Sequence, residues 1–597
     1  MEEKKLTGYP TIDMPHQKYF RERPLRDFDV NQKIYSLILD ANKSNLDYKA
    51  IGYMGKNITY KELFDDVKKY ISAFDVLGVK KGDVVPILTT NTPEVAKILL
   101  ALNYIGAISK WVDLRSSEEG LIHYFNEHNC KVCICFDKII KNVEDIISKT
   151  NLETVIVNKP VDSLDKIKNI GYDIMMNLNE KTSVVPKDKR FITFKEFKSL
   201  GKNWDSELKM ASYDKEEPSL IVQSSGTTGV SKSIIHTDYS VNNSFKEWSY
   251  TDFPLYPGNS LLVTVPPFVA YGLVGSYFLA LSLGMRAELC PKIDESTVYD
   301  NLGKFDISYA APLHYRYLRD KIKSKPDAEK IKDLLSVKAF VTGGDKITES
   351  EIKEIYDLLE SYGCYTPILN GYGNNEGLGA ECVNPYIHNK LGSIGVPLPF
   401  NKFTAVDLNT GKELKYGEVG EICVQTETKF VEYTNNEQAT KETKKLHEDG
   451  QEWIHTGDLG YLDEDGYIHL KGRLRRVIIK AAFKISPDTI EKVICSHPAV
   501  KDCVTVGVND EKDVSVPMAF ITLKDEYIMN KQQILEEIKA VCYKGLKDYE
   551  IPYYYEIIDT IPYTDNNKQD FRKLETIGNE IVENQNLNNH NKVLKRI

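Results

Sequence analysis

A loop rich in serine, threonine and glycine is the feature that most constrains how this chain can fold. Residues 222–233 read Val-Gln-Ser-Ser-Gly-Thr-Thr-Gly-Val-Ser-Lys-Ser, a run with hydroxyls, backbone N–H groups and one ammonium but no acidic side chain. Such a set of donors is suited to holding phosphate oxygens. Apolar, mostly β-branched residues flank the loop at 220–222 and 234–235. The pattern therefore predicts a phosphate-binding loop between two strands.

The same loop nearly matches the Walker A pattern of P-loop NTPases. Counted from Gly226, that pattern requires Gly-Lys-Ser after four intervening residues, and Ser231 stands where the second glycine is needed. A P-loop also opens a helix whose N-terminus faces the phosphates, whereas residues 233–237 have the texture of a strand. We therefore expect strand, loop and strand, and we keep a P-loop NTPase as an alternative.

Composition and charge narrow the class of protein. The 597 residues are 42% hydrophobic and 27% charged, which allows a large core and several domains. A net charge of −10 and an isoelectric point near 5.7 argue against nucleic-acid binding, which usually needs a basic surface. Residues 1–6 lack the apolar core of a signal peptide. We therefore expect a cytoplasmic protein that binds no nucleic acid.

The ten cysteines are scattered along the chain and imply no disulfide framework. Cys130, Cys133 and Cys135 lie close together, shortly after His123 and His128. Their order and spacing match no common zinc module, and the alternating cysteines favour a strand over a metal site.

Residues 260–285 contain no charged side chain and are long enough to cross a bilayer. The segment also contains Pro266 and Pro267 and three glycines. A strand that ends at the prolines, followed by a buried helix after Tyr271, explains it better than a transmembrane span. Peripheral membrane contact remains open.

The order of helical and strand patterns along the chain predicts an α/β fold. Residues 58–110 and 154–345 alternate helical and strand patterns, as in sheets covered by helices. From about 394 to 467 the pattern changes to short strands with glycine and aspartate turns. We expect a large domain over 1–472, a small α/β module over 473–578, and a disordered tail over 579–597, which is rich in asparagine and lysine.

Five motifs in order along the chain resemble those of the adenylate-forming (AMP-binding) superfamily. They are the 222–233 loop, Thr-Gly-Gly at 342–344, Asn-Gly-Tyr-Gly-Asn-Asn-Glu at 370–376, Thr-Gly-Asp at 456–458, and Pro-Tyr-Thr-Asp-Asn-Asn-Lys at 562–568. The surrounding sequence looks most like bacterial acyl-CoA synthetases, and the resemblance covers about residues 30–575. It implies a large N-terminal domain, with two α/β subdomains and a small β-barrel-like region, and a small mobile α+β C-terminal domain.

The resemblance also implies which residues bind ATP and Mg²⁺. In the family the loop holds the β- and γ-phosphates, a tyrosine packs on adenine, a glutamate binds Mg²⁺ and an aspartate accepts hydrogen bonds from the ribose. The nucleotide-binding residues implied here are Ser224, Ser225, Gly226, Thr227, Thr228, Gly229, Lys232, Gly343, Gly344, Asn370, Gly371, Tyr372, Gly373, Asn375, Asp458 and Arg473. The metal ligands implied are Glu376 and Thr228.

The implied reaction joins a carboxylic acid to ATP, giving acyl-AMP and pyrophosphate. Lys568 matches the family lysine that bridges the substrate carboxylate and the α-phosphate, and it is the implied catalytic residue with Glu376 and Thr228. The small domain of relatives then rotates about a hinge, here Arg475, and a thiol attacks the anhydride. CoA is the expected thiol. Relatives usually have glycines where Ala481 and Ala482 stand beside the pantetheine tunnel.

The substrate pocket is expected at Phe268, Val269, Tyr271 and Gly272. Amino-acid-activating relatives carry an aspartate at the position of Val269, so a charged amine would lack its partner here. The apolar run over 262–283 suggests a hydrophobic acyl or aryl pocket. The resemblance to bacterial acyl-CoA synthetases implies a medium- or long-chain fatty acid. Two alternatives remain: an enzyme that loads an acyl or aryl group onto a separate carrier protein, and a non-catalytic nucleotide-binding protein.

Overall fold

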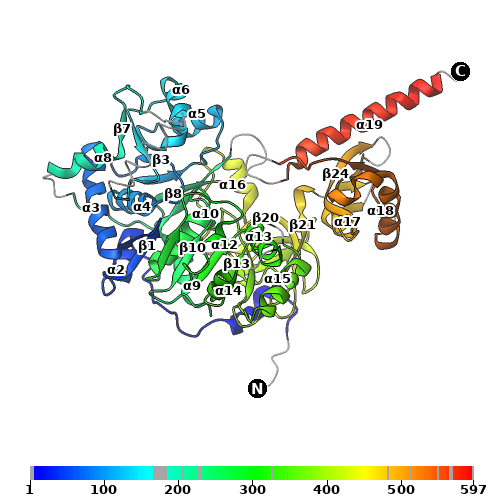
Figure 1. The fold of residues 1–597 in the computed structure, drawn as a ribbon, viewed down its shortest axis with the longest axis horizontal. Coiled ribbons are helices and arrows are strands. Elements are labelled where there is room, and N and C mark those ends of the chain that lie inside the picture. Colours follow the sequence, from blue (N-terminus) through cyan, green and yellow to red (C-terminus); the bar gives the residue numbers. More distant parts are fainter. Residues whose placement is uncertain are drawn as a thin grey trace.

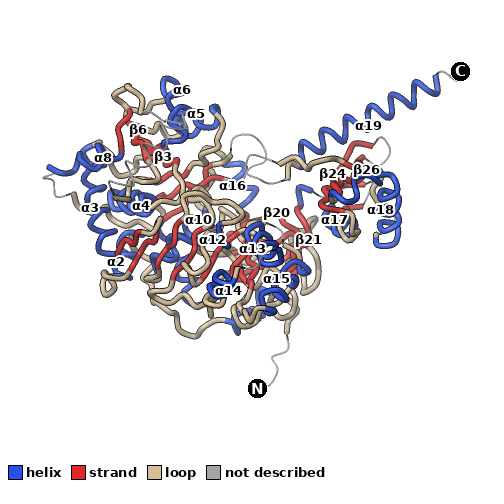
Figure 2. The backbone as a smooth tube through the Cα atoms, viewed as in Figure 1, coloured by secondary structure: helices blue, strands red, loops and turns tan. Residues whose placement is uncertain are grey.

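The computed structural model describes residues 6–165, 185–203, 208–224, 231–324, 327–345, 347–476, 478–480, 483–510, 514–546, 550–563 and 569–594. In Figure 1 a large body, coloured blue to yellow, carries a small orange and red domain at one side. Helices surround the strands of the large body, as Figure 2 shows.

Two sheets with parallel centres form most of the large body. One has the order β16-β15-β14-β13-β12-β10-β11-β1-β2, and the other has the order β7-β6-β5-β3-β4-β8-β9. The first comprises β16 Val396–Pro397, β15 Cys382–Val383, β14 Ile368–Tyr372, β13 Ala339–Thr342, β12 Ile307–Ala310, β10 Ser260–Val263, β11 Arg286–Leu289, β1 Lys49–Tyr53 and β2 Lys56–Thr59. The second comprises β7 Phe191–Thr193, β6 Thr154–Asn158, β5 Val132–Phe136, β3 Val84–Leu88, β4 Ile108–Trp111, β8 Pro218–Gln223 and β9 Ser233–Thr237. This is the α/β class that the alternating pattern predicts.

Helices connect these strands and cover the sheets. They include α2 Ile34–Asn42, α3 Tyr60–Val76, α4 Pro93–Ile105, α5 Glu118–Asn126, α6 Ile140–Ile146, α8 Phe194–Leu200, α9 Asp238–Ser249, α12 Thr297–Asp300, α13 Pro312–Ser324, α14 Ala328–Leu334 and α15 Glu349–Ser361. Helix α4 shows how the sequence sets its ends. Thr92 is the N-cap, Pro93 opens the first turn, and Gly106 closes the helix at a φ of 84°.

The uncharged segment 260–285 is part of the protein core. It forms β10, then α10 Ala270–Gly272, the π-helical turn η5 Leu273–Phe278 and α11 Leu279–Ser282, whose residues are buried apart from Tyr271. The expectation of a strand and a buried helix is confirmed. Within the described residues, no helix combines the length and apolarity that a bilayer span would need.

The region from about 394 onward contains an antiparallel sheet. Its order is β17-β18-β20-β19, with β21 also paired to β20. The strands are β17 Lys402–Val406, β18 Gly420–Gln425, β19 Lys444–Leu446, β20 Glu452–Leu462 and β21 Ile468–Arg473, and α16 Glu437–Thr443 precedes β19. This is the region that was expected to be barrel-like.

The small domain has its own sheet and core. The order is β23-β22-β25-β24, with β26 paired to β25. The elements are β22 Ile478–Lys480, β23 Phe483–Ile485, α17 Pro487–Ile494, β24 Val500–Asp510, β25 Val514–Leu523, α18 Lys531–Gly545, β26 Tyr554–Ile557 and α19 Phe571–Leu594. Helix α19 projects away from the body in Figure 1. We expected a disordered tail after residue 578, whereas α19 continues past that residue to Leu594. Leu574 and Val582 pack the first half of α19 in an apolar cluster with β24 and β25.

Candidate functional site

The serine- and glycine-rich loop joins two antiparallel strands. Strand β8 ends at Gln223 and β9 begins at Ser233. The Ser224 N–H donates to the Lys232 carbonyl at 2.9 Å, and the Lys232 N–H donates to the Ser224 hydroxyl at 3.0 Å. The strand, loop and strand prediction is confirmed, and a helix in the P-loop manner does not follow. Five predicted binding residues, Ser225, Gly226, Thr227, Thr228 and Gly229, lie outside the described residues.

The base of this loop is anchored to helix α5 and the loop after it. The Ser231 N–H donates to the Tyr124 hydroxyl at 2.9 Å, and the Ser233 hydroxyl donates to Glu127 Oε2 at 2.8 Å. Glu127 also pairs with the buried ammonium of Lys110. Burial lowers the pKa of Lys110, and the charge of Glu127 opposes that shift. These contacts fix the position from which Lys232 extends.

Tyr433 connects Lys232 with Glu376. The segment around Tyr433 runs along β9, because the Val431 N–H donates to the Ile235 carbonyl at 2.8 Å. The Lys232 ammonium lies 4.6 Å from the centre of the Tyr433 ring, and the Tyr433 hydroxyl donates to Glu376 Oε1 at 2.6 Å. We call Lys232, Tyr433 and Glu376 the Tyr433 clamp. Sequence reasoning missed Tyr433, since nothing in its local sequence marks the pairing with β9.

Strand β14 and the turn after it form one wall of the site. Asn370, Gly371 and Tyr372 end the strand, and Gly343 and Gly344 follow the neighbouring strand β13. At Gly373 a Cβ atom would lie 2.5 Å from the Gly379 carbonyl oxygen. Only glycine allows the two arms of this turn to approach so closely.

Tyr372 and Asp458 come together from two different sheets. The Tyr372 hydroxyl donates to Asp458 Oδ2 at 2.5 Å. Asp458 lies on β20, is 5% exposed, and stands opposite Arg473 in the register of β20 and β21. Desolvation and the charge of Asp458 raise the pKa of Tyr372, so the phenol keeps its proton. The predicted adenine and ribose contacts are therefore neighbours.

Asn375 joins three segments through its amide groups. Its side-chain nitrogen donates to the Gln223 carbonyl at 2.6 Å, and its side-chain oxygen accepts from the Ala270 N–H at 3.0 Å. Its own carbonyl lies 2.8 Å from His236 Nε2, which must therefore donate. Burial lowers the pKa of His236 to about 4, so this ring is neutral at pH 7. The sequence suggested a phosphate contact for Asn375 and missed both this bridging role and His236.

Glu381 is a second functional candidate that sequence reasoning missed. Its carboxylate accepts the Asn374 N–H at 3.2 Å, in the turn that carries Glu376. Burial raises the pKa of Glu381 to about 8, and the nearby charge of Glu376 adds to the shift. A raised pKa in a carboxyl beside a predicted metal ligand is a signal that only the tertiary structure provides.

The predicted pocket residues adjoin this turn. Val269 precedes α10, and Gly272 ends it. The Tyr271 ring stacks on Tyr309 with centroids 6.2 Å apart, and the Phe268 ring lies 5.7 Å from the Arg115 guanidinium carbon. A Cβ at Gly379 would lie 2.4 Å from the Tyr271 nitrogen, so the turn after Gly373 abuts α10.

The start of the small domain carries a cluster of basic residues. Arg473 ends β21, and Arg475 lies in the short 3₁₀ turn η6 Leu474–Arg476. The Arg476 guanidinium contacts Asp488 at 3.2 Å, pairs with Glu491, and lies 3.9 Å from the Phe571 ring centre. The ion pairs of Arg476 therefore bind it to α17, and its ring contact joins it to the first residue of α19.

The loop that carries Lys568 is closed at its base. Lys568 itself, with Ala481 and Ala482, lies outside the described residues. Tyr563 and Gln569 form an antiparallel bridge across the loop. Burial raises the pKa of Tyr563, and the charges of Asp502 and then Asp345 add to the shift.

The family models and the individual relatives that match this chain give the same result. The family model described as AMP-binding enzyme matches residues 39–434, and the model of the AMP-binding enzyme C-terminal domain matches residues 489–568. A long-chain-fatty-acid–CoA ligase of Bacillus subtilis is 26% identical over 94% of this chain and 95% of its own. A probable 4-coumarate–CoA ligase of Dictyostelium discoideum is 25% identical over 88% of this chain and 92% of its own.

Solved structures share the fold. ATP-bound MatB from Rhodopseudomonas palustris superimposes with a TM-score of 0.77 at 20% identity, over 92% of this chain and 99% of that one. The fold class expected from the sequence, a large mixed α/β domain followed by a smaller one, is therefore confirmed.

Proposed function

Because this chain belongs to the AMP-binding enzyme family, the adenylate-forming superfamily that its motifs resemble, we propose that it converts a medium- or long-chain fatty acid to acyl-CoA. The acid and ATP form acyl-AMP and pyrophosphate, and the thiol of CoA then takes the acyl group. The class of enzyme is an AMP-forming acid–thiol ligase.

One arrangement supports nucleotide binding more than any other. The turn after β14 contacts the phosphate-loop side through the Tyr433 clamp, with Glu376 2.6 Å from the Tyr433 hydroxyl. The same turn contacts the ribose side through Tyr372, 2.5 Å from Asp458. Groups suited to the phosphates and to the ribose of one nucleotide are therefore joined through a single turn.

The chemistry needs positioning and charge neutralisation, because a carboxylate and ATP are both anions. Lys232 and Lys568 supply positive charge, and fixed donors of this kind stabilise the transition state without reorganising. Glu376 offers the hard oxygen ligand that Mg²⁺ prefers, and Thr228 is its proposed second ligand; the bound ion would neutralise phosphate charge. Lys568 is the residue we assign to the reacting carboxylate.

One observation supports a fatty acid as the substrate, and a second argues against an amino acid. The Bacillus subtilis relative that matches over 94% of this chain is a long-chain-fatty-acid–CoA ligase. Val269, at the N-terminus of α10, offers no carboxylate to a substrate amine. Other relatives are named for aryl acids, so an aryl acid is the second candidate. A carrier-protein thiol is the alternative acceptor.

The test measures pyrophosphate release from Mg-ATP with fatty acids of graded chain length, aryl acids and amino acids, each with and without CoA. We expect release to depend on fatty acids, and mass spectrometry to find the acyl-CoA. Pyrophosphate release with aryl acids but not with fatty acids would overturn the proposal of a fatty acid as the substrate. Acyl-AMP without a thioester would favour a carrier protein.

Two results separate the remaining alternatives. A P-loop NTPase would form ADP without any acid, whereas a non-catalytic protein would bind ATP and release no pyrophosphate. Glu376→Gln should abolish most of the release, while Glu418→Gln, at an exposed residue in the loop before β18, should leave it unchanged.

A further inference from the structure

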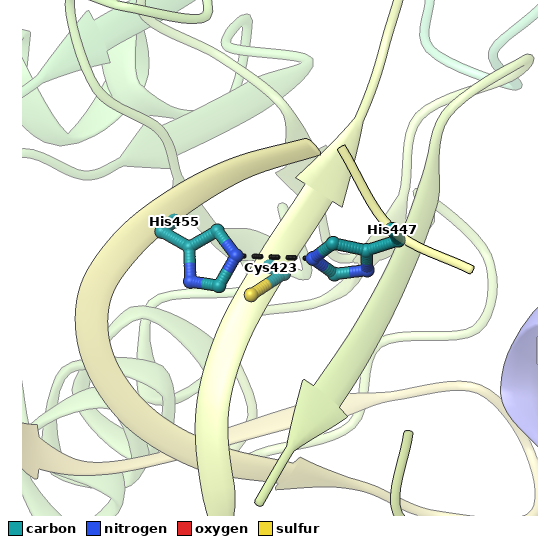
Figure 3. Close-up of side chains that lie close together, drawn as sticks. All are labelled: Cys423, His447 and His455. Carbon is teal, nitrogen blue, oxygen red and sulfur yellow. Dashed lines mark hydrogen bonds between the residues drawn. The ribbon is translucent and has the colours of Figure 1, made fainter. Parts of the chain in front are cut away.

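Three potential metal ligands meet on the antiparallel sheet, next to the Thr-Gly-Asp motif at 456–458 but not part of it. Figure 3 shows Cys423 with His447 and His455 on either side. Their ligand atoms all lie within 4.8 Å of one another, and the two Nε2 atoms are 3.0 Å apart. Neither the motifs nor the family matches assign this cluster, which we call the Cys423 cluster.

The fold places the three side chains with little freedom. Cys423 on β18 stands directly opposite His455 on β20 in the antiparallel register, so both side chains point to one face of the sheet. His447 follows β19 in the turn that leads into β20, where its N–H donates to the Gln451 carbonyl at 3.0 Å. Its ring stacks on Trp453, with centroids 5.1 Å apart and planes 10° apart.

A carboxylate orients one of the histidines. His455 Nδ1 lies 2.8 Å from Glu421 Oε2 and must donate to it, because a carboxylate only accepts. The lone pair of His455 is therefore on Nε2, where it accepts a hydrogen bond from His447 Nε2. A metal ion would take the place of that hydrogen atom, with His447 then protonated on Nδ1. A histidine that donates its outer N–H to a carboxylate while its other nitrogen faces inward is the usual arrangement of a metal-bound histidine.

We propose that Cys423, His447 and His455 bind Zn²⁺, with a water molecule as the fourth ligand. One thiolate and two imidazoles form a ligand set typical of zinc, whereas Mg²⁺ and Ca²⁺ prefer oxygen. Bonds of about 2.0–2.1 Å in a tetrahedral site place two nitrogens about 3.3 Å apart. The two Nε2 atoms, at 3.0 Å, need only a small adjustment to reach that separation.

The bound ion would stabilise the hairpin that carries Asp458. Glu421 also accepts the Gly457 N–H at 3.1 Å, one residue before Asp458. A metal that holds His455 against β18 would therefore hold this turn too. Zinc binds cysteine as the thiolate and must displace the thiol proton, so the affinity should fall as the pH is lowered.

The test uses the full chain, stripped of metal with a chelator and kept reduced, without nucleotide. Calorimetric titration with Zn²⁺ should show one ion per chain with a dissociation constant below about 1 µM. Titration with Co²⁺ should give a thiolate-to-cobalt charge-transfer band and the visible bands of a tetrahedral site. Zinc should also raise the melting temperature.

Two variants test the ligands and one serves as a control. Cys423→Ser and His447→Asn should each weaken binding at least tenfold and remove the tetrahedral cobalt spectrum. Cys495→Ser makes the same change as the first variant at an exposed cysteine, and it should bind as the wild type does. His447 lies in a partly exposed turn, so its variant should fold; melting temperatures without metal check this.

Three results would overturn the proposal. They are a dissociation constant above about 10 µM, a cobalt spectrum without the thiolate band, and binding that Cys495→Ser removes but Cys423→Ser spares. None of these results depends on the ligase reaction, so the metal site and the proposed activity fail or succeed separately.

Discussion

Removing the hydroxyl of Tyr433 should release Glu376 and leave the contact between Tyr433 and Lys232 in place. In Tyr433→Phe the ring that faces Lys232 at 4.6 Å remains, whereas the 2.6 Å hydrogen bond to Glu376 is lost. A hydrogen bond to a charged group contributes about 1.5–3 kcal/mol. Taking about 2 kcal/mol, we expect kcat/KM for Mg-ATP to fall about thirtyfold, with a higher Mg²⁺ concentration needed for half-maximal rate.

A double-mutant cycle with Glu376→Gln checks this reasoning. If Tyr433 acts through Glu376, the effects of the two changes should couple by about 1 kcal/mol or more. Tyr53→Phe is the control, because Tyr53 is equally buried and donates to the Pro160 carbonyl at 2.6 Å. It should lower the melting temperature and spare kcat/KM. Additive effects, or an equal loss of kcat/KM in Tyr53→Phe, would refute the positioning role of Tyr433.

Three further predictions concern the loop, the buried carboxyl and the domain junction. Lys568→Ala removes a charged donor and should slow acid-dependent pyrophosphate release about a hundredfold, from a loss of about 3 kcal/mol, while the exposed Lys573→Ala should not. Glu381 keeps its proton in the folded state up to a pKa of about 8. Its stabilising contribution is therefore complete below the ordinary carboxyl pKa and is lost as the pH rises through 8. Between the ordinary carboxyl pKa and pH 8, the free energy of unfolding of the wild type should therefore fall relative to that of Glu381→Gln, by up to about 1.4 kcal/mol per pH unit. Parallel pH profiles of the two proteins would contradict this. Gly472→Val places a Cβ 2.5 Å from Asp488 Oδ2 at a φ of 153°. The strain is about 2 kcal/mol, and limited proteolysis after residue 473 should accelerate about tenfold; an unchanged cleavage rate would show that the junction tolerates a side chain.

The sequence was most informative where function depends on local residues. The Ser-Gly-Thr loop, the 370–376 turn and the Thr-Gly-Asp segment were recognised from their residues, and the structure brings Tyr372 and Asp458 within 2.5 Å. Lys568 and residues 225–230 lie outside the described residues, so their roles stay predictions.

The cysteines show the opposite case. Cys130, Cys133 and Cys135 are near one another in sequence and near two histidines, but the structure buries them in an apolar cluster around β5. Cys423, His447 and His455 span more than thirty residues of sequence, and only the pairing of β18 with β20 brings them together. The sequence analysis correctly favoured a strand for Cys133 and Cys135, but spacing along the chain gave no indication of the Cys423 cluster.

The sequence by itself determined the family, the α/β class and the polar motifs, because these depend on local pattern: alternating apolar periods, glycines at tight turns and donors in one loop. Only the tertiary structure decided which distant groups meet. Tyr433 reaches Glu376 because its segment pairs with β9, and Glu381 has its raised pKa because the fold buries it beside Glu376. Contacts of this kind depend on strand register and burial, which are properties of the folded chain as a whole.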